Sequence, residues 1–398
     1  MQGCCAALAL AARGAEVVLY ERAERLLTRA AVANEGKIHL GYMYANDPGL
    51  ATARMMVRGA FDFAPFLSRH LGIDPADIPV SAPATYVVHR DSQRSVEEVA
   101  GYLEAVHRLV GAAEDSRRGS YFGREMTAPL RRWAEPERGA CFDPAVILAA
   151  FDSPEIAVNP VALTDAIGAR VADEPAITLR LFHDVHAVED ADAPVVVASH
   201  ADATGRERFD HVVNALWEGR LAIDATLGLA PRRPWLHRLK YGVSFRLPDR
   251  AIRPPSTTVI SGPFGEVVTY PDGSLYLTWY PTCLRALSSD LTPPNWPSRP
   301  SQPDSASIAE GTLAAMAAFV APLRGLCVAD LSDLVVRGGA IVAWGATDIY
   351  DVASELHHRF EIGVSTHRQY HSVDPGKLTL APHFAEAVAD RILAGRRT

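Results

Sequence analysis

The amino-acid sequence predicts an α/β fold in which a second, α+β domain, built on an antiparallel sheet, is inserted into the first. Two observations predict this division. The chain opens with a helix, a buried strand and an acidic residue in that order, which is typical of half of a βαβ unit. Between residues 241 and 280, β-rich segments instead follow one another without a helix, which favours antiparallel pairing. A length of 398 residues is usual for two domains.

The opening helix and strand are defined by small and apolar residues. Residues 3–13 contain good helix formers, and Gly14 is suited to end the helix. The short apolar run Val17–Tyr20 predicts a strand buried on both faces, and Glu21 follows it. This is the second half of a Rossmann-like dinucleotide-binding fingerprint, with Gly3 as its third glycine and Glu21 as its ribose-binding acid. No strand or glycine pair precedes Gly3, so we expect the first strand of the sheet to be missing, as in an incomplete chain start.

The later elements follow from the spacing of apolar residues. Helices are predicted over residues 50–70, 96–110, 161–171, 308–323 and 382–394. Strands are predicted over residues 84–90, 182–189, 194–200, 209–216, 241–247, 256–262, 265–281 and 334–344. We expect the strands at 194–200 and 209–216 to be neighbours joined by a glycine-containing turn at 203–208. Asp272-Gly273 predicts a hairpin turn, and the Pro- and Ser-rich residues 291–307 predict a surface excursion.

Three later motifs place small or flexible residues where a backbone can approach a ligand closely. The first is the loop Asn34–Ala45, of sequence NEGKIHLGYMYA. The second is the strand end at Asn214 and Ala215, followed by Trp217. The third is the turn Gly376–Thr379, of sequence GKLT, which presents the N–H groups of a helix N-terminus.

Taken in order along the chain, these motifs resemble the D-amino-acid-oxidase-like (DAO) superfamily of FAD-dependent oxidoreductases. The GKLT turn is similar to that of the glycerol-3-phosphate dehydrogenase branch. The loop is similar to the N-x-G-x-I-H-x-G-x-Y-Y pattern of the 2-hydroxyglutarate oxidase branch, through Asn34, Gly36, Ile38, His39, Gly41, Tyr42 and Tyr44. The resemblance implies an FAD-binding domain of residues 1–70, 140–217 and 334–398, and a substrate domain of residues 71–139 and 218–333.

The resemblance also implies which residues contact FAD. Gly3 would lie near the pyrophosphate, Glu21 would bind the adenosine ribose, and Arg22 would lie beside the adenine. Lys377 and the adjoining helix would favour the anionic reduced flavin. The other expected contacts lie in the loop, at two strand ends and in the turn: Ala33, Asn34, Gly36, Lys37, Ile38, Val185, Ala215, Gly376, Leu378 and Thr379.

The chemistry implied is hydride transfer to flavin N5 from a C–H that carries an amine or a hydroxyl group. The substrate would be a small amine, amino acid or 2-hydroxy acid. His39 is the candidate base. His367 and Arg368 precede the turn and are expected to contact the substrate. A cation of the β-rich segments, such as Lys240 or Arg246, is suited to bind a substrate carboxylate.

Composition excludes several other classes. The net charge of −8 argues against nucleic acid as a partner. The five Cys include no CxxC pair, so we expect neither a disulfide framework nor a metal site. The apolar start lacks the basic region of a signal peptide and no stretch is long enough for a membrane span, so we expect a cytoplasmic enzyme.

Two alternatives accompany this prediction. The missing first strand suggests a truncated, non-catalytic remnant or a binding protein that keeps the FAD fold, and it predicts poor FAD affinity. Half a fingerprint is also compatible with an NAD(P)-dependent dehydrogenase, although the mid-chain and C-terminal motifs argue for FAD.

Overall fold

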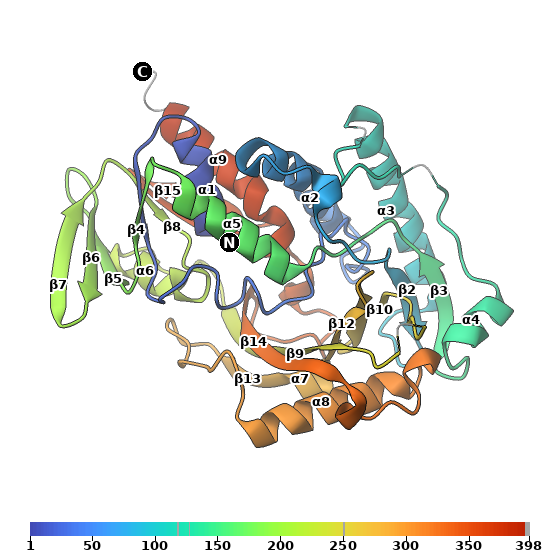
Figure 1. The fold of residues 1–398 in the computed structure, drawn as a ribbon. Helices are drawn as coiled ribbons and strands as arrows, with labels where there is room; N and C mark the ends of the chain where they lie inside the picture. Colours follow the sequence, from blue (N-terminus) through green and yellow to red (C-terminus); the bar gives the residue numbers. More distant parts are fainter. Residues whose placement is uncertain (118, 127, 250, 395–398) are drawn as a thin grey trace.

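The computed structural model describes residues 1–117, 119–126, 128–249 and 251–394, and Figure 1 shows its two halves. One half holds the first and the last described helix, and the other is built on a large sheet. The helices are α1 (Gln2–Ala11), α2 (Ala51–Leu71), α3 (Val96–Ser116), α4 (Glu135–Cys141), α5 (Pro160–Asp173), α6 (Arg220–Thr226), α7 (Tyr280–Cys283), α8 (Gln302–Ala317) and α9 (Ala381–Ala394). In the described part of the chain, no helix has the length and apolar character needed to cross a membrane.

The large sheet has the strand order β13-β9-β12-β11-β10-β2-β3. An eighth strand, β14, is not part of this linear order and also pairs with β9. Its strands are β2 (Thr85–His89), β3 (Ile147–Asp152), β9 (Trp235–Arg246), β10 (Thr257–Ile260), β11 (Gly265–Thr269), β12 (Ser274–Trp279), β13 (Leu284–Ser288) and β14 (Ser332–Trp344). All neighbours are antiparallel except β10 and β2. The predicted hairpin is confirmed, because β11 and β12 are joined by a turn in which Gly273 has a φ of +85°.

Smaller sheets form the other half. Strand β1 (Val17–Tyr20) pairs in parallel with β4 (Ile177–Arg180). A second sheet has the order β15-β16-β8, and a third the order β5-β6-β7. Their strands are β5 (Asp184–Glu189), β6 (Val195–His200), β7 (Ala203–Arg208), β8 (Val212–Asn214), β15 (Gly363–His367) and β16 (Tyr370–Asp374).

Helix α1 links the two ends of the chain through its packing. Its small side chains allow close approach to α9, and Cys5 and Ala9 are completely buried there. Leu8 is also buried, and burial of one leucine contributes about 1.5–3 kcal/mol. The N-terminus of α1 is therefore fixed beside β1 by packing with the last helix of the chain.

Several sequence-based expectations differ from the observed pairing. Residues 203–208 form strand β7 rather than a turn, and β7 separates β6 from β8 in the chain; β8 pairs with β16 instead of β6. Helix α8 begins at Gln302, inside the expected surface excursion. Strands β3 and β14 belong to the large sheet, although the expected boundaries placed them in the FAD-binding domain. The differences in strand pairing arise because the partner of a strand can lie far away in the sequence, where local patterns do not identify it.

Candidate active site

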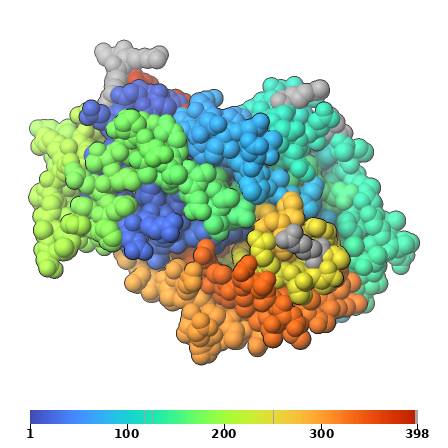
Figure 2. All heavy atoms as spheres, in the orientation of Figure 1, coloured from blue at the N-terminus to red at the C-terminus, as the bar shows by residue number. Residues whose placement is uncertain are grey.

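A cavity of roughly 1360 Å³ lies between the two halves of the protein. It is lined by the start of α1, the end of β1, the loop after β1, the ends of β5 and β8, and residues of β9, β10, β11 and β14. Figure 2 shows early residues, in blue, at the surface between the green segment and the orange strand region. Small-molecule sites occupy about 300–1,000 Å³, so this cavity can hold a ligand longer than a small substrate.

The N-terminus of α1 forms one end of the cavity. Gln2, Gly3 and Cys4 line it, and no side chain caps the helix. Gln2 is 4% exposed, and neither polar atom of its side chain has a hydrogen-bond partner among the described residues. Uncapped N–H groups and the helix dipole favour an anion, so this end fits a phosphate group.

Residues expected to contact a dinucleotide surround this helix end. A Cβ added to Gly3 would lie 3.6 Å from the Cβ of Ala215, so the fingerprint glycine and the β8 strand end are in contact distance. Glu21 lines the cavity and accepts a hydrogen bond from the Ala23 N–H at 2.9 Å. Arg22 and Val185 also line it. The second carboxylate oxygen of Glu21 makes no hydrogen bond with another described residue, so it is available to a hydroxyl donor.

The loop after β1 is folded by its own polar groups. Asn34 donates to the carbonyls of Ala30 and Ala31 and accepts from the Gly36 N–H at 2.8 Å. Gly36 has a φ of +74°, and a Cβ there would lie 1.9 Å from the carbonyl oxygen of Val158. Only glycine fits this turn. Ala33, Asn34, Lys37 and His39 line the cavity, whereas Gly36 supports it from behind.

The predicted turn before α9 closes onto this loop. Gly376, Lys377 and Leu378 line the cavity. Thr379 does not, but its hydroxyl accepts from the His39 N–H at 2.8 Å and donates to the Lys37 carbonyl at 3.3 Å. Ile38 does not line the cavity either. It is fully buried, and its carbonyl accepts a hydrogen bond from the Tyr121 hydroxyl at 2.7 Å. Loop and turn therefore form one connected wall.

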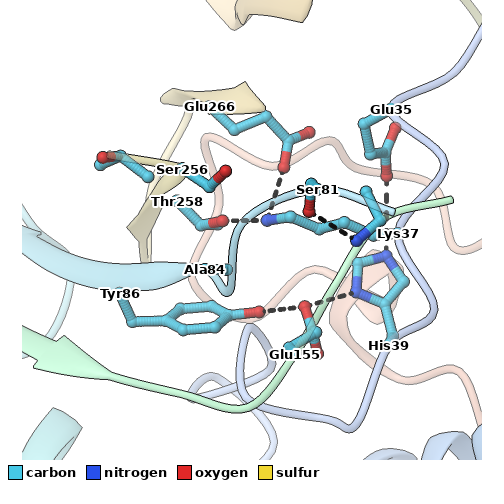
Figure 3. A network of polar contacts seen from close by, with 12 residues as sticks. Glu35, Lys37, His39, Ser81, Ala84, Tyr86, Glu155, Ser256, Thr258 and Glu266 are labelled. Atoms are coloured by element: carbon cyan, nitrogen blue, oxygen red, sulfur yellow. Dashed lines mark hydrogen bonds and ion pairs between the residues drawn. The ribbon is translucent and has the colours of Figure 1, made fainter. Parts of the chain in front are cut away.

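A network of buried ionisable groups lies along this wall (Figure 3). His39 Nδ1 lies 3.3 Å from Glu155, and His39 Nε2 lies 3.6 Å from Glu35. Glu155 is completely buried and also accepts from the hydroxyl of Tyr86. Burial would raise the pKa of Glu155, but His39, Lys37 and Tyr86 together lower it. The carboxylate is therefore ionised in the fully buried interior.

Lys37 connects the loop to the large sheet. Its Nζ lies 2.7 Å from Glu266 of β11 and donates to Thr258 of β10. The side chains of Lys37 and Glu266 are 2% and 9% exposed. The ion pair is thus nearly desolvated, and each charge requires the other.

Three of the further cations that line the cavity lie near this network: Lys240 of β9, Arg359 and Lys377. Within the described part of the chain, none of them forms an ion pair with a carboxylate. Burial lowers the pKa of Lys377 to about 8, with Arg359 and Lys240 acting in the same direction and Glu35 opposing them. Burial would lower the pKa of Lys240 as well, but Tyr280, Glu35 and Glu266 raise it.

Glu35 is the common counter-charge of Lys240 and Lys377. Burial would raise the pKa of Glu35, but the contact with His39 and the charges of Lys377 and Lys240 hold it well below its usual range. Glu35 therefore remains a carboxylate at neutral pH. Two carboxylates of the lining, Glu35 and Glu266, face four cations, Lys37, Lys240, Arg359 and Lys377, so this end of the cavity has a positive excess.

His367 and Arg368 are not brought to the cavity. They lie at the tip of the β15–β16 hairpin, where both contact Asp190, and their side chains are 41% and 57% exposed. The sequence places them near the turn, but β16 lies between the hairpin tip and Gly376. Arg246 also points away from the cavity, because it pairs with Asp272 and Asp333 at the surface. The expected substrate contacts of these residues are therefore not supported.

Comparison with known proteins decides the family. The sequence model of the DAO family, described as FAD dependent oxidoreductase, matches residues 1–391. The chain belongs to this family. The family assignment confirms the resemblance and the FAD cofactor, and it argues against the nicotinamide alternative. Comparison of the sequence with curated proteins found no match.

Solved structures show the same fold. Glycine oxidase from Geobacillus kaustophilus is 15% identical, with a TM-score of 0.67 over 98% of this chain and 92% of that one. L-proline dehydrogenase from P. horikoshii is 15% identical, with a TM-score of 0.63 over 98% and 90%. L-α-glycerophosphate oxidase from Mycoplasma pneumoniae, a structure with FAD bound, is 13% identical, with a TM-score of 0.63 over 98% and 91%. The predicted fold class is confirmed.

The cavity of this FAD-dependent oxidoreductase fits the cofactor. The uncapped N-terminus of α1 suits the pyrophosphate, Glu21 suits a ribose hydroxyl, and the volume suits a dinucleotide with a small substrate. The turn Gly376–Leu378 would contact the flavin end. Sequence reasoning missed Glu155, Glu266 and Arg359, because none of them has a local motif and each has partners distant in sequence. It also missed Glu35, although this residue lies in the loop motif, four residues before His39.

Proposed function

We propose that this enzyme oxidises a small amino acid, another small amine or a 2-hydroxy acid. Bound FAD supplies the hydride acceptor at flavin N5. The protein binds and orients the substrate, excludes water, and accepts the proton of the amine or hydroxyl group. The carbon that loses hydride carries that same group.

The observation that carries this proposal is the positive end of the cavity. Arg359 is buried and Lys240 and Lys377 are half-buried, and none of the three has a carboxylate partner in the described chain. A partly or fully desolvated cation that no carboxylate neutralises favours an incoming anion. The carboxylate of an amino acid or a 2-hydroxy acid supplies such an anion, and Arg359 and the two lysines offer hydrogen-bond donors for it.

The positions of these cations support orientation as well as affinity. Lys240 comes from the large sheet, Lys377 from the turn before α9, and Arg359 is held by its bonds to the carbonyls of Leu356, Val342 and Gly376. Glycine and L-proline, named for two of the similar structures, each carry a carboxylate beside the amine. A cluster fixed from three directions fits a small acid of this kind.

Anaerobic flavin reduction tests the proposal. The FAD-loaded protein is mixed with glycine, L-proline, L-2-hydroxyglutarate or glycerol 3-phosphate, and flavin bleaching is followed. We expect at least one carboxylate substrate to bleach the flavin. Failure of all amino acids and hydroxy acids, with bleaching by glycerol 3-phosphate, would contradict the proposal.

A matched pair of variants tests the role of the positive end. Lys240→Met should raise the KM of the carboxylate substrate about tenfold or more, which corresponds to about 1.4 kcal/mol. Arg246→Met is the control, because Arg246 lies on the same strand but contacts Asp272 and Asp333 at the surface. Equal KM values for the two variants would argue against a role of Lys240 in substrate binding.

A further inference from the structure

Glu155 lies between β3 and α5 and occupies an unusual position for a carboxylate. It is completely buried, yet it accepts from the Leu40 N–H at 2.6 Å and from the Tyr86 hydroxyl, and it lies 3.3 Å from His39 Nδ1. The backbone of His39 is fixed separately by Thr379. The contacts of the Glu155 carboxylate are therefore two hydrogen-bond donors and the imidazole ring.

These contacts determine which ring nitrogen of His39 carries the proton. An ionised carboxylate only accepts hydrogen bonds, so the ring nitrogen that faces Glu155 must be a donor. The neutral ring then has Nδ1–H toward Glu155 and an unprotonated Nε2. Nε2 lies on the cavity side, 3.6 Å from Glu35, and both His39 and Glu35 line the cavity. At 3.6 Å the Glu35 carboxylate is beyond hydrogen-bond distance of Nε2, whereas Glu155 is within it of Nδ1, so Nε2 is the ring nitrogen left to accept a proton.

We propose that Glu155 is a positioning residue that fixes the tautomer of His39, so that Nε2 accepts the proton which the substrate amine or hydroxyl loses. The inference rests on the proposed function and adds to it a pair of residues, Glu155 and Glu35. When the substrate C–H bond breaks, its electron pair leaves with the hydrogen to bound FAD. The N–H or O–H proton goes to Nε2, and the substrate becomes an imine or a carbonyl compound.

Glu35 and Glu155 stabilise the resulting imidazolium ring from both sides. Both carboxylates are ionised, because surrounding cations and donors outweigh the effect of their burial. Other groups that face this ring are the aromatic ring of Tyr44, 6.0 Å away, and Lys37, whose charge acts on Glu155. Lys377 acts on Glu35 from the other side. The arrangement resembles a carboxylate that orients a catalytic histidine in other enzymes.

Glu155→Gln is the direct test, measured with the substrate that bleaches the flavin. The amide keeps the shape but removes the charge and can present a donor to Nδ1. We expect kcat/KM to fall about 10²-fold or more, since general bases contribute about 10²–10⁴-fold. We also expect the acidic limb of the pH profile to move to lower pH, because the imidazolium loses a neighbouring anion.

Tyr86→Phe gives a second, opposite prediction in case the first variant does not fold. It removes one donor from Glu155 and leaves the carboxylate, which should then attract the imidazolium proton more strongly. The acidic limb should therefore move to higher pH, with a small loss of rate. A shift of the same sign in both variants, or no shift in either, would overturn the proposal.

Glu386→Gln is the matched control. Glu386 of α9 pairs with His70 of α2 at 2.8 Å, which is another carboxylate–histidine contact of the same chain, but neither residue lines the cavity. This variant should leave the pH profile unchanged. A shift as large as that of Glu155→Gln would show that loss of any such pair has this effect, and would refute a specific role.

A spectroscopic readout separates this inference from the proposed function. Nitrogen-15 NMR of the histidine rings in the FAD-loaded protein, with His39 assigned by His39→Gln, reports the tautomer directly. We expect the Nδ1–H form in the wild type and a loss of that preference in Glu155→Gln. An Nε2–H ring in the wild type overturns the inference even if substrates bleach the flavin, and the expected tautomer without any bleaching would leave only the proposed function wrong.

Discussion

The two ends of the cavity differ in the groups that line them. At the α1 end, the lining is mostly backbone and small residues, and the sites for a ligand are helix N–H groups, strand ends and one acid, Glu21. At the other end, Glu266 of the large sheet contacts Lys37 of the loop, and Glu155, which follows β3, contacts His39. A cofactor site made of backbone needs only short motifs, whereas a site of desolvated charges requires that each charge is paired within the protein or neutralised by a ligand.

This contrast also explains why one end is recognisable in the sequence. The helix, strand and acid of the α1 end follow each other within 21 residues. The charged end combines Lys37 with Glu266, and His39 with Glu155, across more than a hundred residues. Substitutions should therefore affect stability most at the charged end and cofactor affinity most at the α1 end.

The largest effect is expected from breaking the buried ion pair of the charged end. Lys37→Met leaves the Glu266 carboxylate buried without its partner and should lower the free energy of unfolding by about 3–5 kcal/mol. Urea unfolding of the FAD-free protein measures this. The double variant Lys37→Met/Glu266→Met removes both charges and should recover most of the loss. If single and double variants are equally unstable, the pair is not the source of the effect.

The next effect concerns the glycine turn that joins the two ends. Gly36→Ala should cost about 2–4 kcal/mol, because its Cβ would meet the carbonyl of Val158 at 1.9 Å and its φ is positive. Gly14→Ala is the control, since Gly14 has a φ of +82° but nothing within 4 Å of its Cβ. It should cost about 1–2 kcal/mol. Equal unfolding midpoints for the two variants would contradict the close contact at Gly36.

Lys377 gives the charged end a pH dependence. The pKa of Lys377 is lowered to about 8, chiefly by burial, so its positive charge is lost as the pH rises through that value. The KM of an anionic substrate should rise between about pH 7 and 9, by up to about tenfold. Lys377→Met should have the high KM at all pH values in this range. A wild-type KM that stays constant would argue against substrate binding by Lys377.

The same residue links pH to folding. Unfolded Lys377 keeps its proton up to its ordinary pKa of 10.5, whereas the folded protein releases it near 8. Between these values the unfolded state binds more protons, so the contribution of Lys377 to stability rises with pH. Lys377→Met should remove this rise, which unfolding measured across that range can detect.

The smallest effect is expected at the α1 end. Glu21→Ala should weaken FAD binding about 5- to 10-fold, equivalent to about 1–1.4 kcal/mol, because one hydrogen bond to a ribose hydroxyl is lost. Glu24→Ala is the control, since Glu24 is exposed and does not line the cavity. Titration of the apoprotein with FAD measures both. Equal affinities would show that Glu21 does not bind the cofactor.

Local rules specify the residues that the sequence predicts as cofactor contacts. Gly3, Glu21, Asn34 and Gly376 follow from strand, turn and helix-end signals, and the structure brings all four to the cavity. The sequence could not predict Glu155 and Arg359 at the charged end, since neither residue lies in a recognisable local pattern. His367 and Arg368 show the converse error. They are close to Gly376 in sequence, but a hairpin carries them to the surface.

Thr379 couples the position of the loop that contains His39 to the position of the turn Gly376–Thr379. The hydroxyl of Thr379 bonds the N–H of His39 and the carbonyl of Lys37, and both bonds are buried. If the turn moved and the loop did not, the His39 N–H and the Lys37 carbonyl would lose their hydrogen-bond partner. Each unsatisfied buried group would cost about 1–3 kcal/mol. The position of the imidazole ring is thereby tied to the turn Gly376–Leu378. If this turn contacts the flavin as proposed, a poorly bound cofactor would also displace the proposed base, His39.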